Sequence, residues 1–266
     1  FDRRNAKLYA SQVFLGEALW EIDVPGRVPP RLIAKDLGGF NGFEVGPDGM
    51  LYGPLWFKGQ VVKIDPANGA VTVINSEFKI PAAVNLDGRG NLWVIDTATG
   101  ELCKVELASG RRTVVRQLLP SIDNLAIAPD GTVYVSNMAD NSIQAFDPPT
   151  GDLRLLTGGE VAVPAGLKVE GNRLYVADIF SFREVDTRSG AVRDIFRMHA
   201  TDSKMEYPFA VGLSTKHFAL ASWFTGTVQL VDRASGNTVV MAHGFKAPTD
   251  ALPLPDGSVL VAEMAA

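Results

Sequence analysis

Carboxylate and amide side chains recur in this sequence at matching points of short strand-forming segments. Some stand where such a segment starts, and others lie within one. Oxygen ligands of this kind, with no competing cysteine or paired histidine, are those that hard cations such as Ca²⁺ and Mg²⁺ prefer. We therefore expect a shared cation site, with the alternative that each side chain only caps a strand end or forms a turn. The residues at these points are Asn41, Glu44, Asn85, Asp123, Asn124 and Asp250.

A second group of residues follows the strand-forming segments. Asp96, Asn137, Asp178 and Glu263 each end a segment of the same type. The loops that come next contain large apolar side chains, although loops are usually polar, and this indicates an apolar rim around a binding pocket. The alternative is that these side chains pack between sheets. The candidate pocket residues are Trp56, Phe57, Asn85, Asn137, Met138, Asp178, Phe180, Trp223 and Phe224.

Three residues are candidates for catalytic proton transfer: Glu44, Asp123 and His243. Glu44 interrupts an apolar segment, and a buried carboxylate needs either a metal or a cationic partner, for which Lys58 is available. His243 could act as a general base, with an ordinary surface position as the alternative. The same alternatives apply to His199.

A repeat supplies the elements that would position these residues. An aliphatic–aromatic pair recurs along the chain, and each copy reads as the second strand of a four-stranded unit, as residues 41–80 illustrate. A period of about 40–45 residues with four strands per unit is typical of a propeller blade. Recurrent Asp…Gly turns between the third and fourth strands are expected to be structural. The aromatic residues of the pair are Tyr9, Tyr52, Trp93, Tyr134 and Tyr175, at steps of 43, 41, 41 and 41 residues.

The repeat predicts one all-β domain over residues 1–266, a β-propeller of four-stranded antiparallel blades. The chain contains seven segments of the kind that forms the second strand of a blade, called second-type strands below. This count favours seven blades in an incomplete ring, with six blades as the alternative. The chain starts and ends within a blade. The longest insertion between blades, 198–207, contains His199 and could act as a lid.

Composition limits the class of partner. The net charge is −5 and the only basic pairs are 3–4 and 111–112, so no clustered basic surface is expected for nucleic acid or an anionic membrane. No apolar stretch approaches the roughly 18 residues that span a bilayer. We therefore expect a soluble protein with a small-molecule substrate.

The single cysteine, Cys103, excludes an intramolecular disulfide and is expected at a half-buried strand position. The chain begins at Phe1 rather than Met, so cytoplasmic, periplasmic and secreted locations all stay open, as does the oligomeric state.

The blade motifs resemble those of the senescence-marker-protein/gluconolactonase (regucalcin-like) propellers. The resemblance rests on NGF…PDGMLY at 41–52, NLA…PDG at 124–131 and LYVAD at 174–178, and it covers nearly the whole chain. It extends to NHL-repeat propellers and, more distantly, to streptogramin lyases. The family is mostly six-bladed, against the seven second-type strands counted here.

The resemblance implies one divalent cation, usually Ca²⁺, held by a Glu and several Asn or Asp at the mouth of the central channel; Mg²⁺, Mn²⁺ and Zn²⁺ are alternatives. Asn41 and Asp123 match the ligand motif most directly. Asn124 and Asp250 are one residue out of register. The early Glu of the family has no clear counterpart, unless it lies upstream of Phe1 or Glu44 replaces it.

These observations predict a metal-dependent hydrolase of the lactonase type that acts on a small lactone or ester. The cation would polarise the carbonyl and activate a water. The alternatives are a lyase or isomerase on the same metal site, or a non-catalytic propeller that binds a ligand or a protein. The sequence contains no Gly-x-Ser-x-Gly motif, Walker loop or zinc-ligand spacing that would support other chemistry.

Overall fold

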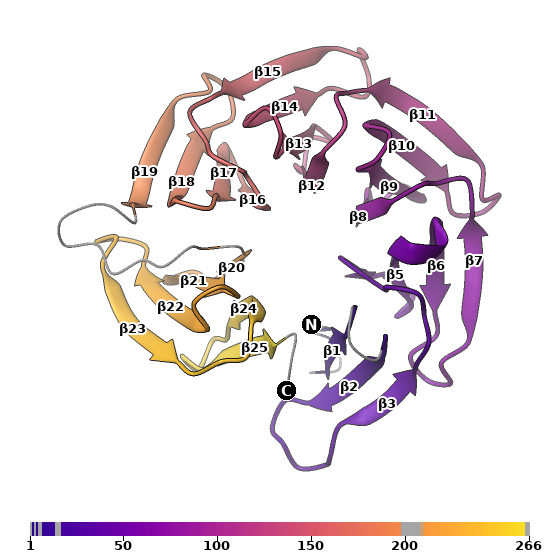
Figure 1. Cartoon of the computed structure of the whole chain (residues 1–266), viewed down its shortest axis with the longest axis horizontal. Helices are drawn as coiled ribbons and strands as arrows, with labels where there is room; N and C mark the ends of the chain where they lie inside the picture. The colour runs from indigo at the N-terminus through magenta and orange to yellow at the C-terminus, as the bar shows by residue number, and fades with distance from the viewer. Residues whose placement is uncertain are drawn as a thin grey trace. The chain divides into compact units, whose positions relative to one another are not determined.

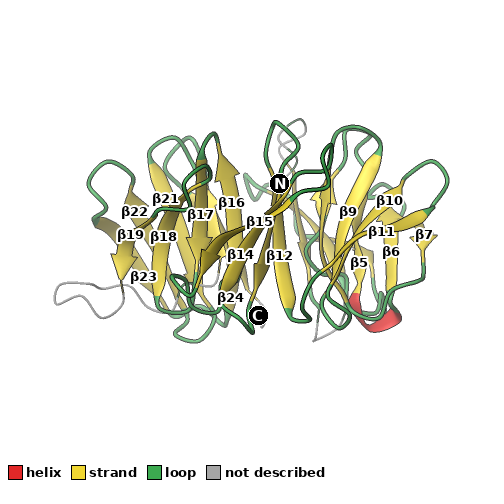
Figure 2. Ribbon diagram, turned by 90° about the horizontal axis from the view of Figure 1, so that it is seen from above, coloured by secondary structure: helices red, strands yellow, loops and turns green. Residues whose placement is uncertain are grey.

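The computed structural model describes residues 2, 4, 7–13, 17–197, 208 and 210–263. It divides into two compact units, Phe1–Ile122 and Asp123–Ala266. Regular structure is almost entirely β-strand, and in the described ranges the single helix is a 3₁₀ turn, η1 (Trp56–Lys58), red in Figure 2. Nothing in these ranges forms a helix long and apolar enough to cross a membrane.

The first unit contains three antiparallel sheets in chain order (Figure 1). Each strand pairs with its neighbours in sequence, so each sheet is a simple meander. A three-stranded sheet consists of β1 (Lys7–Ser11), β2 (Leu19–Asp23) and β3 (Arg31–Ala34). Two four-stranded sheets consist of β4 (Glu44–Val45), β5 (Leu51–Leu55), β6 (Gln60–Ile64) and β7 (Val71–Asn75), then β8 (Pro81–Leu86), β9 (Asn91–Asp96), β10 (Glu101–Glu106) and β11 (Arg112–Gln117).

The second unit continues the same meander after the boundary within β12. Three sheets have four strands and the last has two. They are β12 (Ile122–Ile127), β13 (Val133–Asn137), β14 (Ser142–Phe146) and β15 (Leu153–Gly158); β16 (Gly166–Glu170), β17 (Arg173–Ala177), β18 (Ser181–Asp186) and β19 (Val192–Arg197); β20 (Ala210–Leu213), β21 (His217–Ser222), β22 (Thr227–Asp232) and β23 (Thr238–His243); and β24 (Pro248–Pro253) with β25 (Val259–Glu263).

Asp and Gly residues at fixed positions close the turns. Between β4 and β5, Asp48 Oδ1 accepts the N–H of Met50 at 3.1 Å, and Gly49 has a φ of 84°, which a residue with a side chain rarely adopts. Between β18 and β19, Asp186 Oδ1 accepts the N–H of Ser189 at 2.8 Å. The prediction that the recurrent Asp…Gly turns are structural is confirmed in this turn.

The core lies between the faces of successive sheets. All five residues of β5 and of β13 are buried, as expected of a strand covered on both sides. In the first unit, Tyr52 and Val61 of one sheet pack with Val84 and Cys103 of the next. Cys103 is fully buried rather than half-buried, and burial raises the pKa of its thiol to about 12, so it is unreactive.

The predicted fold class, an all-β propeller of four-stranded antiparallel blades, is confirmed. All seven second-type strands exist, as β1, β5, β9, β13, β17, β21 and β25. Five sheets are complete blades. The remaining strands form the three-stranded sheet β1–β3 and the two-stranded sheet β24–β25, in which β25 is an additional second-type strand. The six-blade alternative therefore fits, and the preferred count of seven arose from β25, which belongs to a two-stranded sheet.

Candidate functional site

Asp123 is the carboxylate with the most unusual environment. It lies near the start of β12 and is half-buried, and its side chain has no hydrogen bond or ion pair with any described residue. Burial raises the pKa of its carboxyl group to about 6. Other described carboxyl groups with a shifted pKa, such as Asp186 and Glu21, shift downward because hydrogen-bond donors stabilise their charged forms. Asp123 therefore carries a charge that the described protein groups do not compensate.

Asn124 and Asp250 occupy equivalent positions near the starts of β12 and β24. In each, Oδ1 accepts the N–H of the following residue, Leu125 or Ala251, at 2.9 Å. Asn124 is half-buried and Asp250 is exposed. One side-chain oxygen of each is therefore already used locally, and Asp250 keeps its second oxygen open.

The remaining candidate ligands lie in the first unit. Asn41 Nδ2 donates to the carbonyl of Ala82 at 3.2 Å, which orients its amide and leaves Oδ1 open. The Glu44 carboxylate accepts the N–H of Leu86 at 2.6 Å. Lys58, the alternative partner of Glu44, instead donates from Nζ to the carbonyl of Asp36.

The candidate ligand set is thus divided between the two units. Asn41, with Glu44 and Asn85, belongs to Phe1–Ile122, whereas Asp123 and Asp250 belong to Asp123–Ala266. Asn85 is half-buried on β8, opposite Trp93. Within the described residues, no three His, Cys, Asp or Glu side chains form a group that could hold a metal.

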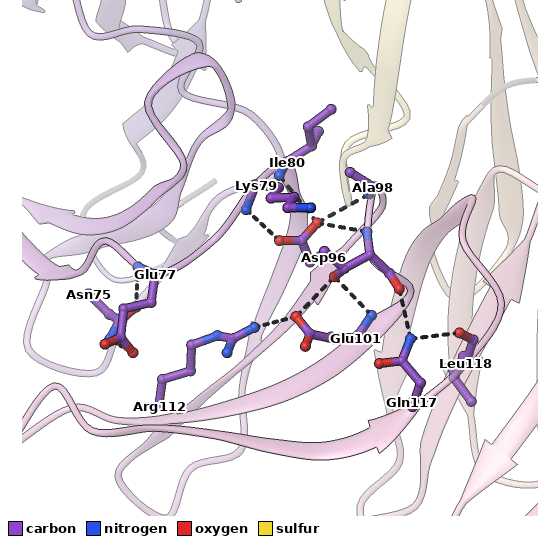
Figure 3. Close-up of polar contacts among 11 residues, drawn as sticks. Asn75, Glu77, Lys79, Ile80, Asp96, Ala98, Glu101, Arg112, Gln117 and Leu118 are labelled. Carbon is purple, nitrogen blue, oxygen red and sulfur yellow. Dashed lines mark hydrogen bonds and ion pairs between the residues drawn. The ribbon is translucent and has the colours of Figure 1, made fainter.

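The polar residues that end the second strands accept hydrogen bonds from backbone N–H groups of nearby segments. Asp96 is 1% exposed, and its oxygens accept the N–H groups of Lys79 and Ile80, at 2.6 and 3.2 Å, and those of the turn after β9 (Figure 3). It therefore ties the segment that enters its sheet to the β9–β10 turn. Asn137, also buried, accepts the N–H of Ala139 at 2.8 Å.

Asp178 repeats this arrangement with more partners. Its oxygens accept the N–H groups of Ala162, Phe180 and Ser181 at 3.1, 2.9 and 2.6 Å, and Nε of Arg183 donates to it at 2.6 Å. These contacts match the structural alternative, in which strand-end residues form caps, because the oxygens of Asp178 already accept several hydrogen bonds.

Aromatic side chains after the second strands reach the surface. Phe57, Phe180 and Phe224 are 56%, 40% and 60% exposed. Trp56 stacks on Phe57 with ring centroids 5.8 Å apart, and Trp223 lies 5.1 Å from Phe224. Part of each phenylalanine ring is therefore exposed to solvent.

The remaining predicted residues are Met138, His243 and His199. Met138 is half-buried in the β13–β14 turn. His243 is exposed at the end of β23, opposite Thr227. His199 and the insertion 198–207 lie outside the described residues.

Comparison with known proteins identifies the fold. No family model matches the sequence, and no curated protein matches it. A streptogramin B lyase structure is similar with a TM-score of 0.79 and 13% identity, over 98% of this chain and 88% of that one. A chain of a nidogen/laminin complex is similar with a TM-score of 0.73 and 15% identity, over 90% of this chain and 93% of that one.

The extracellular domain of a protein described as a hybrid two-component system from B. thetaiotaomicron gives a third likeness. Its TM-score is 0.77 at 13% identity, over 99% of this chain and 38% of that one. At such identities these likenesses define a class by fold alone, the β-propeller. They do not distinguish the gluconolactonase-like subfamily that the sequence resembles.

The raised pKa of Asp123 predicts a pH-dependent stability. The folded protein binds the proton of this carboxyl more tightly than the unfolded chain, so stability falls as the pH rises from about 4 to about 6 and stays reduced above that. The Asp123→Asn variant has no carboxyl group at this position, so it lacks this fall in stability with pH. We expect the variant to be more stable than the wild type by about 1–2 kcal/mol at pH 8, less than the full shift would give because the group is partly solvated.

Urea unfolding of both proteins between pH 4 and pH 8 measures this difference. At pH 4 the two should agree, because the wild-type carboxyl is then largely protonated. Asp152→Asn is the matched control, since Asp152 is exposed in the β14–β15 turn of the same sheet and its side chain has no described partner. A difference between Asp123→Asn and wild type that does not change with pH would contradict the expectation.

Proposed function

We propose that the protein is a metal-dependent hydrolase of the lactonase type that acts on a small lactone or ester. The observation that carries the proposal is the state of Asp123, a half-buried carboxylate with a raised pKa and no described partner. Leaving a charge uncompensated costs stability, and groups with strongly perturbed pKa values cluster at functional sites. A ligand that supplies positive charge would remove the cost.

A hard divalent cation fits the donor chemistry. Within the second unit, Asp123 offers two open oxygens and Asp250 offers Oδ2, while Asn124 would have to share an oxygen that already accepts a hydrogen bond. Carboxylate and amide oxygens favour Ca²⁺, with Mg²⁺, Mn²⁺ or Zn²⁺ as alternatives. When bound, such a cation polarises a carbonyl and lowers the pKa of a bound water.

The protein's own groups would then handle the proton and the substrate. A carboxylate near the substrate, such as that of Asp123, would take a proton as a general base. Glu44 and His243 are the other candidates for this role. The exposed rings of Phe180 and Phe224 would contact the apolar part of the substrate, so we expect a more apolar lactone or ester than a simple sugar lactone.

Calorimetric titration with Ca²⁺, Mg²⁺, Mn²⁺ and Zn²⁺ tests the proposal. We expect the wild type to bind at least one of these cations and Asp123→Asn to bind it at least tenfold more weakly, because an amide has one oxygen donor and no charge. Asp250→Ala should also weaken binding, whereas Asp152→Asn should match the wild type. Cation binding that is unchanged in both Asp123→Asn and Asp250→Ala would reject the ligand assignment.

Activity assays separate the alternatives. Cation-dependent hydrolysis of a panel of lactones and esters, lost in Asp123→Asn, would support the hydrolase. Cation binding without hydrolysis would favour a lyase, the activity named for one structural neighbour, streptogramin B lyase. No cation binding would leave a binding propeller, which the exposed rings of Phe57, Phe180 and Phe224 favour.

A further inference from the structure

A cavity of about 310 Å³ lies between two sheets of the second unit, β16–β19 and β20–β23. Its wall includes Lys216 of the β20–β21 turn and Arg233 of the β22–β23 turn. Phe180 and Phe224 belong to the β17–β18 and β21–β22 loops, at the opposite ends of the same sheets. The cavity is therefore separate from the surface to which the proposed hydrolase function refers.

Arg233 is a fixed part of this wall. Its Nη1 donates to the carbonyl of Ser214 at 2.7 Å, and its Nη2 donates to the hydroxyl of Tyr175 at 2.9 Å and to the carboxylate of Glu170. The guanidinium also lies over the ring of Phe218, 5.0 Å from its centroid. Because its charge and donors are used within the protein, Arg233 shapes the cavity without being available to a ligand.

Three more cations line the cavity with groups still available. The side chains of Arg173 and Arg193 are 60% and 64% exposed and share one carboxylate, that of Glu184, at 3.7 and 3.1 Å. Each guanidinium has five N–H donors, so one carboxylate leaves most of them open. Lys216 is exposed, and its ammonium group has no partner among the described residues. The other lining carboxylate, Asp232, accepts hydrogen bonds from the turn that follows it.

The cavity therefore has an excess of positive charge in a chain whose net charge is −5. We propose that it binds a small molecule through a phosphate or carboxylate group held by Arg173, Arg193 and Lys216. Guanidinium groups match the paired oxygens of both anions, and the cavity volume is within the range of small-ligand sites.

Calorimetric titration at constant ionic strength tests this site, with inorganic phosphate and citrate as the probes. We expect the wild type to bind at least one of them in the millimolar range or tighter. Lys216→Ala and Arg193→Ala should each weaken that binding about tenfold, because each removes one cation from the site. Both side chains are exposed, so the variants should unfold in urea like the wild type.

Arg188→Ala is the matched control, since Arg188 is an exposed cation of the β18–β19 turn and does not line the cavity. It should bind the probe like the wild type. Binding of phosphate alone or of citrate alone would identify the anion and support the site. The proposal is overturned if neither probe binds, or if the control variant loses as much affinity as Lys216→Ala and Arg193→Ala.

Discussion

Asp178→Ala is expected to destabilise the protein by about 3–5 kcal/mol, because it leaves a largely buried guanidinium and three backbone N–H groups without their acceptor. Asp178 is fully buried, and Arg183, whose Nε donates to it, has a side chain that is only 13% exposed. Nη1 of Arg183 also donates to Asp194 at 2.7 Å, so part of its charge stays paired. The free energy of unfolding from urea titration measures the loss.

Two further variants separate the loss of charge at Asp178 from the loss of its whole side chain and from the effect of a surface substitution. Asp178→Asn keeps the shape and one acceptor oxygen but places an NH₂ group against donors, so we expect an intermediate loss of about 1–3 kcal/mol. Asp152→Ala, on the surface of a neighbouring sheet, should change stability by no more than about 0.5 kcal/mol. A loss in Asp178→Ala as small as that of Asp152→Ala would mean that the hydrogen bonds and the ion pair of Asp178 contribute little to the free energy of unfolding.

The strand pattern could be predicted because burial and turn chemistry are local properties. Strands such as β13 begin with an apolar run and are buried throughout, since both of their faces are covered, and the Asp…Gly turns mark where strands reverse. The blade count was less predictable. A second-type strand such as β25 has the same local pattern whether or not third and fourth strands follow it.

The partners of polar residues could not be predicted from the sequence. Asp123 and Asp178 both border strands in a similar pattern, yet Asp178 is fully hydrogen-bonded whereas Asp123 has no described partner. The difference depends on which amides and which arginine the neighbouring segments bring near. The same is true of the cavity, whose cations Arg173, Arg193 and Lys216 come from different strands and turns and show no shared motif.

The turn glycines have a second role that the turn pattern alone does not reveal. A Cβ atom on Gly110, in the β10–β11 turn, would lie 2.4 Å from the carbonyl oxygen of Ile74 in the preceding sheet. The same close approach occurs between Gly69 and Ile33 and between Gly190 and Leu156. Glycine at this point therefore allows one sheet to pack directly against the backbone of the sheet before it.

Gly110→Ala is accordingly expected to destabilise the protein by about 2–4 kcal/mol, the sum of a left-handed φ penalty and the strain of displacing a neighbouring strand. Gly88→Ala is the matched control in the same sheet. Gly88 has a φ of 69° against 71° for Gly110, but a Cβ there would meet no described atom within 4 Å. The control should lose only the φ penalty, about 1–2 kcal/mol.

Urea unfolding of both variants measures the difference, which isolates the contact between sheets because the φ term is common to both. Nδ2 of Asn75, at the end of β7, donates to the carbonyl of Gly110 at 3.1 Å, so a displaced turn would weaken a second link between these sheets. Asn75→Ala in the Gly110→Ala background should then cost less than in the wild type. Equal losses in Gly110→Ala and Gly88→Ala would show that the sheets tolerate a methyl group at this point and that the turn glycine serves only its own backbone conformation.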